Sequence, residues 1–230
     1  MLYLKLRKGR TRTSDKRRSV VPIVRRKARK YGQVLDERAL SVKRDWLVTG
    51  ANAAGKSRWL GRLYGEAPGI WKKRPAIYLR AVSPLAAWGE DERVQAWSEN
   101  AGQPWSRLRV WERTEKLIAW IEEHRAVVLL DDAHLMTGRK ADVALRCVRA
   151  AGLVVTSASA EGRIPITLRL ALQSREPERV HLDSDAPYDL TAVLAWMLVV
   201  MAAAAGAWPL AAAIGGITML GRGARSAKQT

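Results

Sequence analysis

Short apolar runs alternate with amphipathic runs through the middle of the chain. Five runs have the continuous apolar character of strands buried on both faces: residues 45–50, 76–82, 126–132, 152–157 and 178–183. Apolar positions recur at helical spacing between and after them, in residues 55–66, 91–102, 111–124, 140–152 and 166–174. Strands separated by helices of about 10–15 residues predict βαβ units. We therefore expect a three-layer α/β domain with a parallel central sheet over residues 31–187.

The pattern changes near the C-terminal end, where no charged side chain occurs from Leu190 to Gly221. A single helix of these 32 residues would be about 48 Å long, against a hydrocarbon core of about 30 Å. Residues 188–221 are therefore predicted to be a membrane anchor, either one tilted transmembrane helix or a helical hairpin that breaks near Gly206 and Pro209.

The basic tail, residues 222–230, favours the cytoplasmic side of a membrane. A hairpin would keep both this tail and the α/β domain on that side, whereas a single span would export the tail. These considerations predict the inner (cytoplasmic) membrane as the location, with the α/β domain facing the cytoplasm.

Basic residues outnumber acidic ones by 40 to 22, for a formal net charge of +18. Thirteen of the cations lie in residues 1–30, where Asp15 is the only acid. A segment of this composition repels itself, so we expect a largely disordered basic arm. Its predicted partner is a polyanion, either DNA or anionic lipid.

Residues 50–57 read Gly-Ala-Asn-Ala-Ala-Gly-Lys-Ser, between a predicted strand and a predicted helix. This spacing is typical of a loop whose backbone N–H groups cradle phosphates at the start of a helix. Lys56 would reach the β- and γ-phosphates, and Ser57 would offer its hydroxyl to Mg²⁺. Because no Asn-Lys-x-Asp guanine-binding motif occurs in the sequence, ATP is preferred over GTP. The predicted nucleotide-binding residues are Gly50, Ala51, Asn52, Ala53, Ala54, Gly55, Lys56 and Ser57.

Two acids, Asp131 and Asp132, end the apolar run that begins at residue 126. A carboxylate at the end of a buried strand suits Mg²⁺ opposite Ser57, so Asp131 is predicted on the metal side. Asp132 is predicted to polarise the attacking water. Hydrolases of this type mostly carry glutamate there, and the shorter aspartate predicts slow or conditional hydrolysis.

The order of phosphate loop, acidic strand end and the run GLVVTSAS resembles the additional-strand P-loop ATPases, and AAA+ domains in particular. In that family the strand after the acidic one ends in a polar residue that contacts the γ-phosphate or the water. Thr156 and Ser157 occupy the matching positions, and Ser157 is preferred. The resemblance also implies an arginine that reaches a neighbouring subunit's nucleotide, hence a homo-oligomer. Arg175 and Arg179 are the candidates.

His134 resembles the histidine that follows the acids in DNA-linked members, such as transposition-helper and secretion-linked ATPases, with a packing or capping role as the alternative. The pairing of a P-loop domain with a membrane segment resembles, in part, filamentous-phage assembly ATPases. One feature departs from the family. An AAA+ module normally continues into a small helical lid, whereas here residues 178–183 lead almost directly into apolar sequence.

Two functions are compatible with these features. The first is a membrane-anchored ATPase that couples nucleotide state to DNA or protein transfer or assembly. The alternative is a nucleotide-switched DNA-binding regulator or target-selection helper with little turnover, which the short Asp132 and the missing lid favour. A nucleotide-metabolising kinase is less well supported, because no acceptor-binding motif is visible in the sequence.

Three further features have simple interpretations. Cys147 lies in an apolar helical pattern, which predicts a buried and unreactive thiol. The three histidines lack metal-ligand spacing. Residues 70–75 join Trp71 to three cations and would suit stacking on a nucleic-acid base, with an ordinary exposed loop as the alternative.

Overall fold

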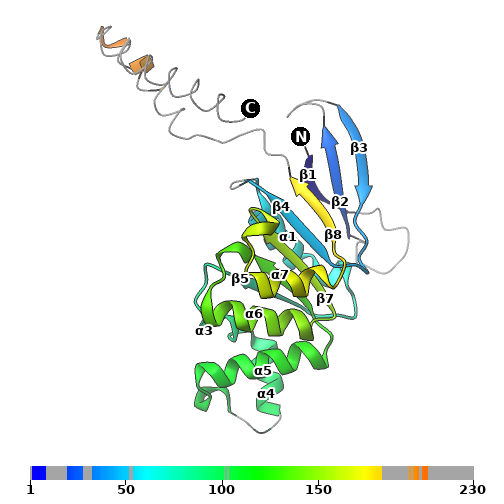
Figure 1. Ribbon diagram of the computed structural model, residues 1–230, viewed down its shortest axis with the longest axis vertical. Coiled ribbons are helices and arrows are strands. Elements are labelled where there is room, and N and C mark those ends of the chain that lie inside the picture. Colours follow the sequence, from blue (N-terminus) through cyan, green and yellow to red (C-terminus); the bar gives the residue numbers. More distant parts are fainter. Residues whose placement is uncertain are drawn as a thin grey trace. The chain divides into compact units, whose positions relative to one another are not determined.

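The computed structural model (Figure 1) describes residues 2–8, 20–27, 33–51, 54–100, 102, 104–182, 197, 199–201 and 204–206. The chain divides into two compact units, Met1–Asp185 and Ala186–Thr230. The first unit contains the elements described below.

The described residues of the first unit form a parallel sheet of five strands. The spatial order is β5-β6-β7-β4-β8, so β7 lies between β4 and β6. An α/β fold with a parallel central sheet is thus confirmed, and β7 is the additional strand that the resemblance implies. The strands are β4 (Trp46–Gly50), β5 (Ala76–Arg80), β6 (Val127–Asp131), β7 (Leu153–Ala158) and β8 (Glu178–Leu182).

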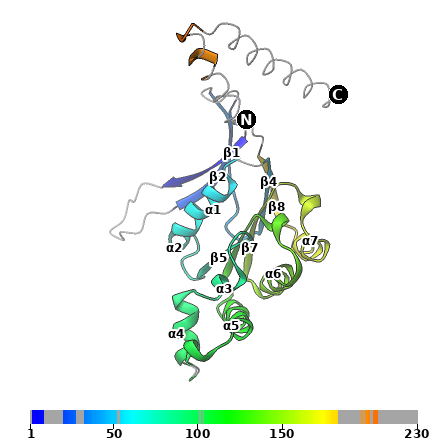
Figure 2. The same cartoon turned by 90° about the vertical axis from the view of Figure 1, so that its left-hand side faces the viewer.

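Helices cover both faces of this sheet and complete three layers. Figure 2 shows α1 and α2 on one side of the sheet and α6 and α7 on the other. The α-helices are α1 (Lys56–Gly65), α2 (Ala67–Ile70), α3 (Leu85–Trp88), α4 (Glu92–Asn100), α5 (Val110–Glu123), α6 (Gly138–Ala150) and α7 (Ile166–Gln173). Short 3-10 helices are η1 (Trp105–Arg107), η2 (Ala133–Leu135) and η3 (Glu161–Arg163).

The sheet divides the hydrophobic core into two halves. Along β6, Val127 and Leu129 belong to the half that contains α1, whereas Val128 and Leu130 belong to the half that contains α6. All four side chains are fully buried, and each such burial contributes about 1.5–3 kcal/mol. Burial on both faces explains why this strand is a continuous apolar run in the sequence.

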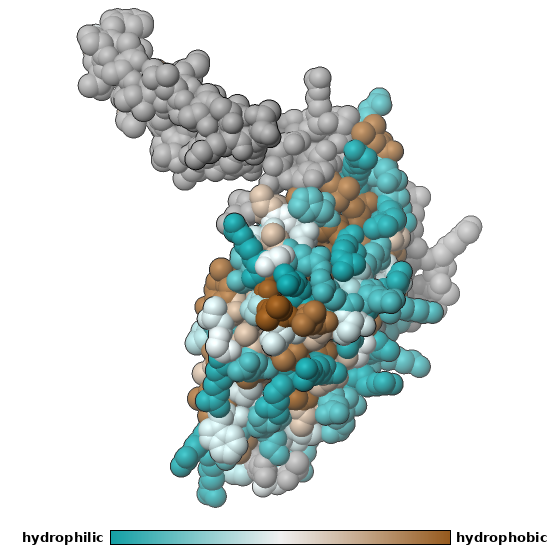
Figure 3. Space-filling model, viewed as in Figure 1, coloured by the Kyte–Doolittle hydropathy of each residue, from teal (hydrophilic) through white to brown (hydrophobic). Residues whose placement is uncertain are grey.

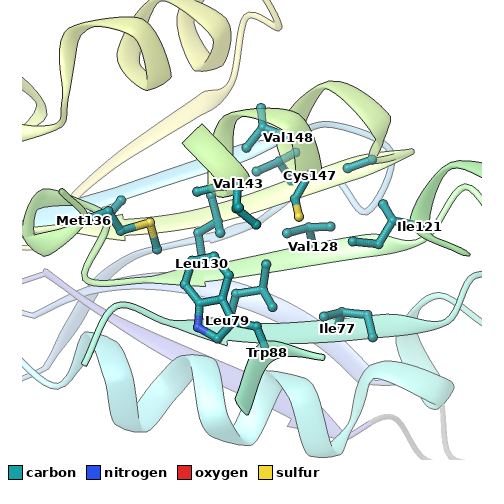
Figure 4. Close-up of a cluster of buried hydrophobic side chains, with 14 of the residues drawn as sticks. Ile77, Leu79, Trp88, Ile121, Val128, Leu130, Met136, Val143, Cys147 and Val148 are labelled. Carbon is teal, nitrogen blue, oxygen red and sulfur yellow. The ribbon is translucent and has the colours of Figure 1, made fainter. Parts of the chain in front are cut away.

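Cys147 lies inside the half of the core shown in Figure 4, among side chains of α6 and the strands. Burial raises the pKa of its thiol to about 12, so the thiolate is scarce at neutral pH. The prediction of a buried cysteine is confirmed.

The exposed surface is mostly hydrophilic on the face seen in Figure 3, where brown side chains gather over α7. Ile166 and Leu170 are exposed on this helix. A cavity of about 530 Å³ lies between α6 and α7, and it is lined in part by Val148, Leu170 and Arg175.

The N-terminal segment forms a second sheet, in the antiparallel order β1-β2-β3. Its strands are β1 (Leu2–Lys8), β2 (Val20–Lys27) and β3 (Val34–Ala39). The prediction of a largely disordered arm is therefore wrong for residues 2–8 and 20–27. The physical reason is the alternation of β1, in which Leu2, Leu4 and Leu6 pack against the α1 half of the core while Tyr3 and Lys5 lie between them.

Acids beyond residue 30 neutralise part of the charge of the predicted basic arm. Arg25 and Arg7 both form salt bridges with Glu37, at 2.5 and 3.0 Å. Lys8 pairs with Glu66 at 2.7 Å, just before α2. These partners lie 12 to 58 positions away along the chain, which is why the composition of residues 1–30 alone suggested an unpaired arm.

Little of the predicted membrane anchor lies within the described residues. Of residues 188–221, the structure describes 197, 199–201 and 204–206. No helix in the described part of the chain is long and apolar enough to span a membrane. The proposed hairpin break at Pro209 and the basic tail lie outside the described residues.

Candidate nucleotide-binding site

The predicted phosphate loop connects the carboxyl end of β4 to the first turn of α1. Gly55 has a φ of 82°, the left-handed conformation that glycine adopts without strain, and it precedes the first residue of α1. Gly50 has a φ of 149°, and a Cβ there would lie 2.6 Å from the main-chain oxygen of Leu182 in β8. The backbone therefore explains both glycines of the motif: Gly55 has a left-handed conformation, and Gly50 lies too close to β8 for a side chain. Asn52 and Ala53 lie outside the described residues.

Lys56 is folded back into this loop. Its side chain is 4% exposed, and its Nζ donates hydrogen bonds to the main-chain oxygens of Gly50 and Ala51, each at 2.8 Å. The Ala54 N–H donates to the Ala51 oxygen at 3.2 Å, which curls the loop. The ammonium is thus held at the centre of the loop, where phosphates would be cradled.

The electrostatics around Lys56 favour an incoming anion. Burial lowers the pKa of Lys56, and the negative charges of Asp132 and Asp131 oppose this shift. Two of the three ammonium donors bind neutral carbonyls, which are weaker partners than a charged oxygen. Phosphate oxygens could therefore replace them favourably.

Asp131 lies buried at the end of β6, with both carboxylate oxygens engaged. Oδ1 accepts a hydrogen bond from the Ser157 hydroxyl at 2.7 Å, and Oδ2 accepts one from the Tyr78 hydroxyl at 2.7 Å. Burial raises the pKa of Tyr78, and the hydrogen bond to Asp131 adds to the shift, so Tyr78 is a neutral donor. The sequence analysis missed Tyr78, because its strand was interpreted only as an apolar run.

Ser157 joins the two acids to each other. Its hydroxyl donates to Asp131 and accepts the main-chain N–H of Asp132 at 2.9 Å. Strand β7 alternates its side chains, so the neighbouring Thr156 lies on the α6 side of the sheet. Its buried hydroxyl has no hydrogen-bond partner there. Ser157 is thus brought into the predicted site, and Thr156 is not.

Ser159 is a polar residue at this site that the sequence analysis missed. It directly follows β7, and its main-chain oxygen accepts the N–H of Gly50 at 3.3 Å. Its hydroxyl is buried without a hydrogen-bond partner. The pairing of Thr49 with Ala158 places Ser159 next to Gly50, which only the strand register reveals.

Asp132 and His134 border a cavity of about 400 Å³ at the start of α1. Asp132 adopts φ 54° and ψ 46°, a left-handed conformation that is uncommon for residues other than glycine. His134 Nδ1 accepts the Ser159 N–H at 3.3 Å, so the neutral ring carries its proton on Nε2. Burial lowers the pKa of His134. The cavity is lined by Gly55, Lys56, Ser57, Arg58, Asp132, His134 and Leu135.

The residues predicted to hold Mg²⁺ fit a cation that takes most of its ligands from phosphate and water. Ser57 borders the cavity, and Asp131 is a buried carboxylate at the adjacent strand end. Within the described ranges, no group of three or more His, Cys, Asp or Glu residues could hold a metal ion by itself. Mg²⁺ commonly binds through one or two protein oxygens plus substrate phosphates, so two ligands are enough.

The two arginine candidates differ in position. Arg175 forms an ion pair with Asp45, with Nε 2.5 Å from Oδ2, at the end of the sheet opposite the phosphate loop. It also donates to the main-chain oxygens of Val148 and Ala151. This internal role removes Arg175 as a candidate for reaching a neighbour's nucleotide. Arg179 is exposed and pairs with Glu161 at 3.3 Å.

Comparison with known proteins gives matches of fold only. No protein-family model matches the sequence, and no curated protein matches it. Among solved structures, 43 chains match. One is the Aeropyrum pernix ORC1 protein in complex with DNA, with 20% identity and a TM-score of 0.42 over 62% of this chain and 40% of that one.

Two others are bacterial. Domain III of the Thermotoga maritima replication initiation protein DnaA is 13% identical, with a TM-score of 0.39 over 68% of this chain and 61% of that one. Thermomonospora curvata EccC (ATPases 2 and 3), in complex with a signal sequence peptide, is 13% identical, with a TM-score of 0.41 over 74% of this chain and 36% of that one. This chain therefore spans less than two thirds of the length of each, and scores this low support no inference about activity. The function must be argued from the site.

Proposed function

We propose that this protein binds ATP with Mg²⁺ and hydrolyses it. The observation that carries the proposal is the buried Lys56, which lies inside a curled glycine loop and is bonded only to carbonyls that phosphate can replace. A lysine is rarely buried without a charged partner, and this one lies at a helix N-terminus, where anions bind favourably. Both features fit a phosphate group as the missing partner.

Each residue of the site has a proposed role. Lys56 binds the β- and γ-phosphates, and the loop N–H groups hold the remaining oxygens. Ser57 and Asp131 would hold Mg²⁺, which neutralises phosphate charge when bound. Asp132 polarises the attacking water, and Ser157 keeps the two acids at a fixed spacing through its two hydrogen bonds.

Ser159 is proposed as the residue that contacts the γ-phosphate or the water. The resemblance to AAA+ domains implied such a role for Ser157. The Ser157 hydroxyl, however, is already occupied as both donor and acceptor. The Ser159 hydroxyl has no partner, and the Ser159 main chain bonds the first residue of the loop.

The cellular role belongs to the same proposal. Residues 188–221 would anchor the protein in the inner membrane, with the α/β domain facing the cytoplasm, and nucleotide state would be coupled to DNA or protein transfer or assembly. The support is the long uncharged stretch and the net charge of +18. A homo-oligomer, in which Arg179 reaches a neighbour's nucleotide, is part of this hypothesis.

A nucleotide-controlled switch with little turnover is the second candidate. The observation that favours it is Asp132, whose short side chain extends from a left-handed backbone instead of the usual helical or extended one. Slow hydrolysis would leave the ATP-bound state long-lived, which suits control of DNA binding by nucleotide.

A turnover experiment on the full chain distinguishes the two candidate functions. ATP binding and hydrolysis would be measured with and without duplex DNA, with Lys56→Ala as the inactive control. Asp132→Glu is the informative variant, because it adds one methylene to the carboxylate arm. Turnover that rises with DNA supports the motor, whereas tight binding with little turnover, accelerated by Asp132→Glu, supports the switch. Wild type that does not bind ATP would refute both.

A further inference from the structure

Five exposed cations gather around the amino ends of β5 and β6, opposite the phosphate loop. We call them the basic edge: Lys72, Lys73, Arg74, Arg125 and Arg149. They come from the segments that precede β5 and β6 and from the end of α6. All five are exposed. The salt bridges formed by the described residues include none of them.

The basic edge is concave. A cavity of about 510 Å³ has Arg74, Arg125 and Arg149 in its lining, together with the single acid Glu122. An adjoining cavity of about 410 Å³ is lined in part by Lys72, Lys73 and Arg74. Because Arg74 borders both cavities, the two form neighbouring parts of one cationic surface.

The backbone at Arg125 adopts a conformation that is uncommon for an arginine. Arg125 has a φ of 45°, in the left-handed region where glycine is favoured. Its main chain is fixed there, since its N–H donates to the Glu122 oxygen at 3.1 Å. A Cβ on the neighbouring Gly152 would lie 2.3 Å from the Arg125 oxygen. Arg125 follows the C-cap of α5, where a left-handed residue is common, and it leads directly into β6.

We propose that the basic edge binds the phosphate backbone of a nucleic-acid strand. Three of its five cations are arginines, whose planar guanidinium groups can bind phosphate oxygens in pairs. The concave shape fits a chain of phosphates better than a flat lipid surface. Contacts of this kind fix position without reading sequence, so the binding is non-specific and dependent on salt.

Trp71, the aromatic residue next to the three cations of residues 72–74, does not take part in this surface. Trp71 is buried, packs in a tilted arrangement against Trp46 with ring centroids 5.7 Å apart, and donates its indole N–H to the Val42 oxygen at 3.1 Å. The prediction that residues 70–75 suit base stacking is therefore wrong for Trp71, while Lys72, Lys73 and Arg74 remain exposed. Tyr64, which lines the second cavity, is half-buried and stacks on Tyr78 at 5.7 Å, so the exposed side chains of this surface are its cations, which favour contact with a phosphate backbone.

This surface is distinct from the proposed ATP site and goes beyond the proposed function. The strands are five or six residues long, so the two ends of the sheet are roughly 16–20 Å apart. Nucleotide and nucleic acid could therefore bind at the same time. A failure of ATP binding in Lys56→Ala would not affect this inference, since that residue lies at the other end of the sheet.

The test is fluorescence anisotropy of the full chain with labelled single-stranded and duplex DNA over a series of salt concentrations. The variant Arg125→Gln/Arg149→Gln is expected to bind single strands roughly tenfold more weakly. It should also lower the slope of log K against log salt by about 1.4, because each lost phosphate contact accounts for about 0.7. The matched control is Arg107→Gln/Arg139→Gln, which removes two exposed arginines outside the basic edge. Equal losses in the two variants would contradict the proposal.

Arg125→Gly separates function from stability. Glycine relieves the strained backbone, so Tm should rise while DNA affinity falls; a higher Tm with unchanged affinity would overturn the proposal. The same variants are tested by flotation with phosphatidylglycerol vesicles. Loss of vesicle binding with unchanged DNA affinity would assign the surface to lipid instead and would also overturn it.

Discussion

At the carboxyl ends of the central strands, Lys56 and Asp131 are buried and bonded to protein partners, whereas the five cations of the basic edge, at the amino ends, are exposed and form no salt bridge with another described residue. Lys56 and Asp131 each have less than a twentieth of their surface exposed. Arg125 and Arg149, at the opposite end, face a polar cavity. A buried charge selects a ligand that can replace its partners in a defined geometry, while exposed cations attract any polyanion. One sheet thus supports a selective site and a non-selective one.

Asp45→Ala should have the largest effect on stability. It removes a buried carboxylate at the amino ends of the strands, where Asp45 forms an ion pair with Arg175. Asp45 is 7% exposed and accepts from both Arg175 and the Val154 N–H. Its removal leaves a partly buried arginine without its carboxylate, so the free energy of unfolding should fall by about 3 kcal/mol. Denaturant titration measures this. Exposed Asp142→Ala is the control and should change stability by less than about 0.5 kcal/mol.

Lys56→Ala should weaken ATP binding by about 1.5–3 kcal/mol, through loss of a charged donor to phosphate. Stability should hardly change, because the substitution also removes the desolvation cost of the buried ammonium. Calorimetric titration with ATP and Mg²⁺, together with thermal unfolding, checks both parts. A large loss of Tm with intact ATP binding would show that Lys56 serves the fold rather than the ligand.

Two buried hydroxyls without partners provide a sharper comparison. Ser159→Ala should slow hydrolysis by roughly tenfold, since loss of one hydrogen bond to a charged group costs about 1.5 kcal/mol or more. Thr156→Val removes a hydroxyl on the other face of β7 and should leave hydrolysis unchanged while raising Tm slightly. Steady-state kinetics at saturating ATP distinguishes the two. Equal effects on turnover would exclude a special role for Ser159.

The smallest expected effect concerns pH. Burial lowers the pKa of His134 below its ordinary value of 6.5, so the unfolded chain binds this proton more readily than the folded one. The stability that the neutral ring contributes is therefore present above pH 6.5 and is lost as pH falls below it. Denaturant unfolding between pH 5 and 8 should show a weaker dependence in His134→Asn. An unchanged profile would mean that His134 does not titrate differently on folding.

The fold class and the phosphate loop were accessible to sequence reasoning for physical reasons. Strands buried on both faces must be continuously apolar, and Gly50, Gly55 and Lys56 are chemically constrained within a few positions of one another. The N-terminal sheet was missed because net charge was weighed before the alternation of Leu2, Leu4 and Leu6. That pattern was present in the sequence and could have been recognised.

Other features depend on which strands become neighbours. The sequence by itself determined the α/β class, the loop at residues 50–57 and the acids at the end of β6, because local spacing and hydrophobicity encode them. Only the tertiary structure decided that Tyr78 and Ser157 bond Asp131, that Ser159 lies beside Gly50, and that Arg175 pairs with Asp45. These contacts join residues 26 to 130 positions apart. They follow from strand order and register, which no local pattern specifies.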